Sequence, residues 1–80
     1  MKIPTYPILN IGDWVRIKPD RNLVLGGRVG RIYRHSETFR YDFCIELILY
    51  KNKSFINYKK EELELLSNEE AMLYTLEYYG

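Results

Sequence analysis

The sequence has one cysteine and one histidine among its 80 residues. Cys44 therefore has no partner within the chain for a disulfide. Together, His35 and Cys44 fall short of the three or four ligands of most zinc sites. Covalent or acid–base catalysis needs a nucleophile, a base and an orienting group in one place, and the sequence shows no such set. We therefore expect no metal, no cofactor and no enzymatic activity.

Long apolar runs are also lacking. No run approaches the roughly 20 residues that cross a bilayer, and we see no charged and apolar leader of the kind that precedes a secreted domain. We therefore expect a cytoplasmic protein without membrane contact. A length of 80 residues fits one domain with a modest core, and a hydrophobic content of 46% argues against disorder.

Three glycines fall within the stretch "GGRVGRIYRH", residues 26–35. A phosphate-binding loop needs its glycines after a strand and at the start of a helix, whereas these glycines precede a strand-like segment. The pattern therefore indicates turn geometry rather than a phosphate site. Val29 and Ile32 are three residues apart and cannot share a face of a regular strand, so we predict a bulge or bend at Gly30. The residues then predicted to point outward are Arg31, Tyr33 and His35.

Alternating apolar and polar residues predict a mainly β fold. Val15 and Ile17 share one face of "DWVRIK". In "YDFCIELILY", every second residue from Tyr41 to Leu49 is apolar or aromatic and is predicted to face the core. We expect a small five-stranded antiparallel barrel. Its strands are predicted at residues 13–18, 28–35, 41–50, 54–58 and 62–66, with one helical turn at residues 59–63.

The two ends differ from the barrel. Residues 1–10 contain Pro4 and Pro7, which favour an extended arm, and Ile8, Leu9 and Ile11 are candidates to pin that arm to the barrel. We thus divide the chain into an N-terminal arm (residues 1–10), a barrel (residues 11–66) and a C-terminal helix (residues 67–80).

The C-terminal helix has its own start signal. Ser67 and Glu70 have the spacing of a capping box, and apolar residues then recur at helical spacing, which predicts a helix over residues 68–78. A helix this short is not stable alone in water, so we expect it to pack on the barrel or on another chain. It is either a lid over the barrel or a partner-docking or dimerising helix in which Tyr74, Tyr78 and Tyr79 make the contact.

Charge is divided unevenly along the chain. Residues 1–40 hold eight Lys/Arg and three Asp/Glu, a net charge of +5. Residues 41–80 hold four Lys/Arg and eight Asp/Glu, a net charge of −4. The two halves can neutralise each other across one small surface. Alternatively they can face different partners, or each other in a dimer.

Aromatic rings and cations are interleaved on the predicted outer face of the first two strands. Such a set suits protein interfaces, and it suits nucleic acid, because bases stack on rings while cations meet phosphates. The third possibility is structural, with Trp14 and Tyr33 packed beneath the arm or the helix. The candidate binding residues are Trp14, Arg16, Lys18, Arg31, Tyr33, Arg34, His35 and Arg40.

The segments "IGDWVRI" and "GRVGRI" resemble the start of KOW-type and related SH3-like barrels, through Gly12, Asp13, Val15, Ile17, Gly27, Gly30 and Ile32. The closing "KKEELELL" is similar to the last turn and strand of such barrels, and the resemblance covers residues 11–66. It implies a fold whose KOW and Tudor-like members bind RNA, ribosomal or transcription machinery, or peptide tails. The small barrel protein of photosystem I and the variable chain of ferredoxin–thioredoxin reductase assist docking in electron-transfer complexes, and other such barrels are accessory or inhibitory proteins, some from phages.

The sequence departs from that pattern in three ways: it has no evident aromatic cage, its loops are not long and basic, and both flanking extensions lie outside the resemblance. Our leading hypothesis is a non-enzymatic adaptor that docks on a protein partner, as an accessory or inhibitory component of a larger complex. The alternative is a nucleic-acid-binding module that uses the same basic face. A self-associating structural protein is the third hypothesis.

Overall fold

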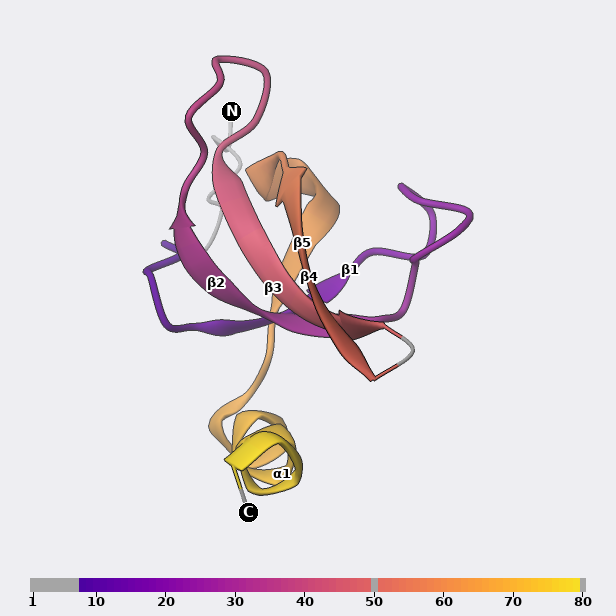
Figure 1. The fold of residues 1–80 in the computed structure, drawn as a ribbon, viewed down its shortest axis with the longest axis vertical. Coiled ribbons are helices and arrows are strands. Elements are labelled where there is room, and N and C mark those ends of the chain that lie inside the picture. Colours follow the sequence, from indigo (N-terminus) through magenta and orange to yellow (C-terminus); the bar gives the residue numbers. More distant parts are fainter. Residues whose placement is uncertain (1–7, 50, 80) are drawn as a thin grey trace, which may run out of the picture.

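Five antiparallel strands and one C-terminal helix make up the computed structural model, which describes residues 8–49 and 51–79 (Figure 1). The strand order in the curved sheet is β4-β3-β2-β1-β5. The mainly β class and the C-terminal helix are confirmed. The elements are β1 (Trp14–Ile17), β2 (Val29–His35), β3 (Phe43–Leu49), β4 (Asn52–Tyr58), the 3-10 helix η1 (Lys60–Glu62), β5 (Leu63–Leu65) and α1 (Asn68–Tyr79).

The sheet is open over the described residues, with β4 and β5 at its edges. The expected closed barrel is therefore replaced by a strongly bent sheet. The strand β5 has only three residues, and all of them pair with β1.

The inner face of the sheet forms the core, as the alternation predicts. Val15 and Ile17 are fully buried, and they meet Ile45 and Leu47 from β3. Burying such side chains is the main favourable contribution to folding, at about 1.5–3 kcal/mol each. The remaining members of the core are Ile32, Phe43, Tyr58 and Leu63.

The predicted bulge at Gly30 is wrong. Gly30 pairs in regular register with Val15, and it faces inward while Val29 faces the outer side. The reason for glycine is a close approach of β3: an added Cβ would lie 2.7 Å from the Glu46 carbonyl oxygen and 2.5 Å from Leu47 Cδ2. Glycine is thus required here by packing rather than by a change of register.

The irregularity of β2 lies three residues later, at Tyr33. Ile32 is opposite Ile45 in β3 and Arg34 is opposite Cys44, so Tyr33 is an extra residue in the ladder. A bulge of this kind shifts the side-chain alternation beyond it. Arg34 consequently joins the outer face. His35 is exposed, but it lies on the inner face opposite Phe43 rather than on the outer face, with ring centroids 5.5 Å apart.

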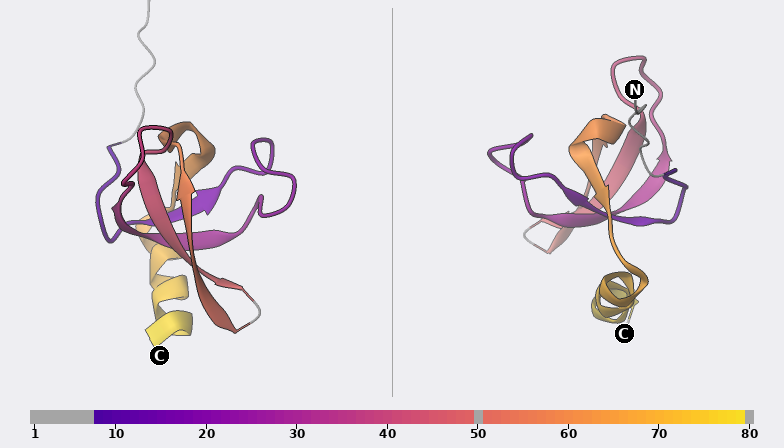
Figure 2. Two further views of the ribbon diagram at one scale, coloured as in Figure 1. Left: turned by 45° about the horizontal axis from the view of Figure 1, so that its top comes forward. Right: turned by 180° about the vertical axis from the view of Figure 1, so that it is seen from behind.

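The two flanking segments are only partly as expected. Leu9 packs against the core, whereas Ile8 and Ile11 are exposed; residues 1–7 of the predicted arm lie outside the described residues. At the other end, α1 begins where the capping signal predicts, because the Glu70 N–H donates to Ser67 Oγ at 3.2 Å. The loop of residues 36–42 and α1 lie at opposite ends of the molecule (Figure 2).

Candidate docking face

The helix α1 covers the outer side of β1. Trp14 is only 7% exposed, and its indole stacks on the Tyr74 ring with centroids 6.3 Å apart. The expected role of Trp14 as an exposed anchor is therefore corrected, since the helix occupies the space that a partner would need. A ring pair of this kind contributes about 0.5–1.5 kcal/mol beyond its buried area.

An ion pair fixes the same contact. Arg16 Nη2 donates to Glu70 Oε2 at 2.6 Å. Glu70 and Tyr74 are four residues apart, so both project from one face of α1. The hydrogen bond from Arg16 holds the pKa of Glu70 below its ordinary value, and the hydrogen bond to Glu70 raises the pKa of Arg16. Arg16 is consequently engaged within the chain rather than presented to a partner.

Two aromatic rings meet on the part of the outer face that α1 leaves open. Tyr33 from β2 and Phe55 from β4 have ring centroids 4.9 Å apart, and the two residues are 53% and 50% exposed. We call this pair the aromatic platform. It is bordered by a hollow of about 310 Å³ that Ile11, Gly12 and Arg31 also line. Half-exposed rings in mutual contact offer a partner apolar surface at little conformational cost.

The cations around the aromatic platform are partly engaged. Arg31 Nε donates to the Gly12 carbonyl at 3.2 Å. Arg34 Nη1 lies 3.5 Å from Glu37, and Lys53 Nζ lies 3.8 Å from the nearly buried carboxylate of Glu46. The side chains of Arg34 and Lys53 still keep large exposed fractions, 43% and 64%.

The other predicted cations lie away from the aromatic platform. Lys18 directly follows β1 and is half-buried, and its N–H donates to the Glu62 carbonyl. Arg40 is exposed in the loop between β2 and β3. Neither residue is brought next to Tyr33 by any contact of the described structure.

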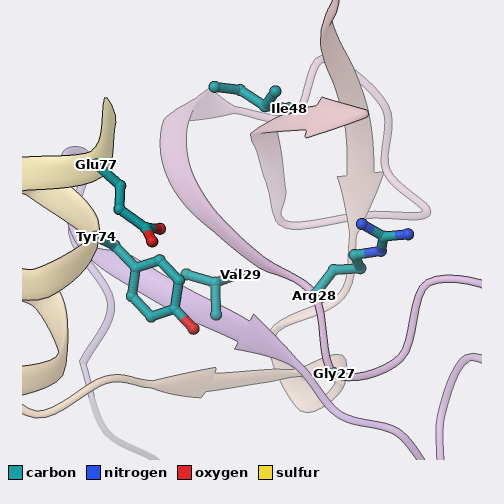
Figure 3. A pocket seen from close by; sticks show the side chains of 6 residues that line it. All are labelled: Gly27, Arg28, Val29, Ile48, Tyr74 and Glu77. Carbon is teal, nitrogen blue, oxygen red and sulfur yellow. The ribbon is translucent and has the colours of Figure 1, made fainter. Parts of the chain in front are cut away.

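A groove lies between α1 and the outer face of the sheet (Figure 3). Its volume is about 450 Å³. Val29 and Ile48 form its apolar side. The side chains of Tyr74 and Glu77 extend into it from α1. Arg28 lies on the opposite rim from Glu77. Because Ile48 pairs with Lys53 in the sheet, it is a diagonal neighbour of Phe55 on the same face. The groove is therefore continuous with the aromatic platform.

The outward side of α1 is apolar and acidic. Met72, Leu73 and Leu76 are each 62–65% exposed, and we call these three residues the α1 ridge. Tyr74, predicted to contact a partner, points at Trp14 instead, while the side chains of Tyr78 and Tyr79 lie outside the described residues. Leu73 and Leu76 share a hollow of the helix flank with Glu77.

The reactive side chains that the structure describes are not gathered in one place. Cys44 is buried on β3, opposite Arg34. Within residues 8–49 and 51–79, no three His, Cys, Asp or Glu side chains are close enough to hold a metal ion. In the same ranges, no helix has the length and apolar character to cross a membrane.

The fold and this face define a small antiparallel β domain with a helix docked on its outer side. The solved structure of YorP from Bacillus subtilis is similar, with a TM-score of 0.58 and 23% sequence identity over 82% of this chain and 79% of YorP. At this identity the likeness shows the fold alone. No known family matches the sequence, and no curated protein matches it.

Sequence reasoning missed Phe55 and the α1 ridge. The signal for Phe55 was present, because Ile56 and Tyr58 alternate inward in β4 and thereby turn Phe55 outward. The ridge had no such signal, since Tyr74 and Leu73 are both apolar and adjacent. The packing of α1 on Trp14 turns Tyr74 toward the sheet and leaves Leu73 exposed to solvent.

Proposed function

We propose that this protein is a non-enzymatic docking module whose interface is the outer face of the sheet, centred on the aromatic platform. The observation that supports this proposal is the half-exposed contact of Tyr33 with Phe55. Aromatic residues and arginine supply most of the binding energy of protein interfaces, and they do so from the centre of the contact. Arg34 borders the pair and Ile48 extends its apolar surface toward the groove.

A protein partner is favoured over a polyanion by the state of the cations. Arg16 is committed to Glu70, and Lys53 is shared with Glu46. Phosphate binding depends on cations that release counterions when they meet a backbone. The nearby carboxylates lower the positive potential that would attract such a backbone. A protein segment with apolar side chains and a few carboxylates fits the same surface without that loss.

Single-stranded nucleic acid is the second candidate, because adjacent exposed rings beside cations are also the arrangement on which bases stack. Titration with oligonucleotides tests it directly. If it is right, affinity falls steeply between about 50 and 200 mM salt, and Tyr33→Ala weakens binding. If no oligonucleotide binds at low salt, this candidate function is excluded.

Residues 11–66 support a module of the SH3-like, KOW or Tudor type through the resemblance of "IGDWVRI" and "GRVGRI". A cytoplasmic setting fits the single buried Cys44, because a reducing compartment keeps thiols unpaired.

The test is a platform variant, Tyr33→Ala/Phe55→Ala, compared with Leu23→Ala/Val24→Ala. The control pair is 99% and 86% exposed in the loop before β2 and also removes two large apolar side chains. Proteins captured from a nuclease-treated lysate are identified, purified and titrated against each variant. We expect the platform variant to bind at least about 10-fold more weakly and the control to bind as the wild type does. Equal affinities for both variants would falsify the proposal.

A further inference from the structure

The α1 ridge and the aromatic platform are complementary in charge. Between Asn68 and Tyr79 the helix contains three glutamates and no lysine or arginine. Glu69 and Glu77 flank the apolar ridge, whereas Arg28, Arg34 and Lys53 border the outer face of the sheet. Each surface also offers large apolar side chains. The cations Arg28, Arg34 and Lys53 outnumber the two neighbouring carboxylates, Glu37 and Glu46. One chain thus presents both an acidic apolar surface and an aromatic surface with an excess of positive charge.

Pairing of two α1 ridges is disfavoured. In an antiparallel pair of helices, Glu69 of one copy faces Glu77 of the other at both ends. In a parallel pair, each glutamate faces its own equivalent. Both arrangements bring like charges together as apolar surface is buried. The ridge therefore fits a cationic surface.

The α1 ridge and the aromatic platform of one chain can both be in contact with a second copy. On the outer face, α1 lies over β1 and the aromatic platform spans β2 and β4. The groove lies beside the helix, lined by Val29 and Ile48 on one side and Tyr74 on the other (Figure 3). A two-fold axis through this groove exchanges the two surfaces. The ridge of each copy then meets the aromatic platform of the other, and the contact closes on itself without forming a filament.

We infer that the partner of this docking face is a second copy of the same chain, with each α1 ridge seated on the other copy's aromatic platform. This inference rests on the proposed docking role and names its partner. Interface size favours the closed arrangement. A 12-residue helix is about 18 Å long, so one ridge alone buries less than the roughly 800 Å² per partner of a stable interface. The two-fold contact is made twice, which doubles the buried area.

Charge reversal tests the inference with the full chain. One variant, Arg28→Glu/Arg34→Glu, makes the outer face acidic and leaves the Lys53–Glu46 pair intact. The other, Glu69→Lys/Glu77→Lys, makes α1 basic. Sedimentation velocity over a range of concentrations should show that the wild type dimerises and that each variant dimerises at least about 10-fold more weakly, because each then opposes like charges.

The decisive sample is the equimolar mixture of the two reversed variants. In a mixed dimer, the acidic α1 meets the unchanged platform, and the basic α1 meets the acidic one, so both contacts are restored. Recovery of the dimer supports the inference and also shows that both variants are folded. A wild type that stays monomeric, or a mixture that does not recover, overturns it. A monomeric wild type that still binds another identified protein through Tyr33 and Phe55 overturns only this inference and leaves the docking role standing.

Discussion

Trp14 and Tyr74 stack with their ring planes 28° apart, and this contact joins the first strand to the C-terminal helix across 60 residues of sequence. It removes the chain's one tryptophan from the surface. It also leaves the opposite side of α1 exposed. Both proposed surfaces therefore depend on how this helix sits on the sheet.

Tyr74→Ala should loosen α1 from the sheet. We expect the free energy of unfolding to fall by about 1–2 kcal/mol, from lost apolar burial and ring contact. The fluorescence of Trp14 should shift to longer wavelength as its ring meets water. Met72→Ala is the matched control, because Met72 is 65% exposed and its loss should change stability by less than about 0.5 kcal/mol. A Trp14 emission spectrum that does not shift in Tyr74→Ala would contradict the packing of Tyr74 on Trp14.

Acid should release the helix through Glu70. Arg16 lowers the pKa of Glu70 from its ordinary 4.5, so the folded state favours the ionised carboxylate. This stabilisation is complete above pH 4.5 and is lost as the pH falls through the lower folded-state pKa. We expect Trp14 fluorescence to report the release as the pH falls below about 4.5. Glu70→Gln should remove this step, and Glu69→Gln should preserve it.

Gly30→Ala should be costly for a steric reason. The new methyl group would overlap Leu47 and the Glu46 carbonyl, and relieving that overlap requires the β3 backbone to move, at about 2–3 kcal/mol. Gly27→Ala is an informative comparison, since nothing lies within 4 Å of an added Cβ there and its φ is +87°. Its cost of about 1–2 kcal/mol comes from backbone strain alone. Chemical denaturation measures both. Equal costs, or a smaller cost at Gly30, would show that close packing is not what requires glycine there.

Tyr58→Phe should be tolerated at neutral pH. Tyr58 is 2% exposed, and its hydroxyl has no hydrogen-bond partner among the residues described, so its removal should change stability by about 1 kcal/mol or less, or raise it. Burial first and Glu62 second raise the pKa of Tyr58 above 10.0. The wild type therefore loses stability as the pH rises above about 10, and the phenylalanine variant should lose less. Urea unfolding at neutral and alkaline pH compares them, with Tyr33→Phe as the exposed control. If the Tyr58→Phe variant and the wild type lose the same stability at alkaline pH, Tyr58 is not the group responsible for that loss.

Short-range pattern predicted most of the fold. Alternation assigned Val15, Ile45 and Leu47 to the core, because successive residues of a strand point to opposite faces. It failed at Gly30, where the apolar spacing was attributed to a bulge. The actual bulge at Tyr33 depends on the pairing with β3, which distant residues determine. The candidate site was predicted only in part for the same reason: Tyr33 and Arg34 were identified, but Phe55 was not.

Residue spacing predicted the strands and most of their inward faces, and the Ser67–Glu70 cap predicted the start of α1 at Asn68. Tertiary structure alone decided which outward residues remain available to a partner. Trp14 and Tyr33 have similar chemistry, yet one lies under a helix and the other is half exposed. That difference arises from Arg16 and Trp14 meeting Glu70 and Tyr74, a contact between the two ends of the chain that no local pattern encodes.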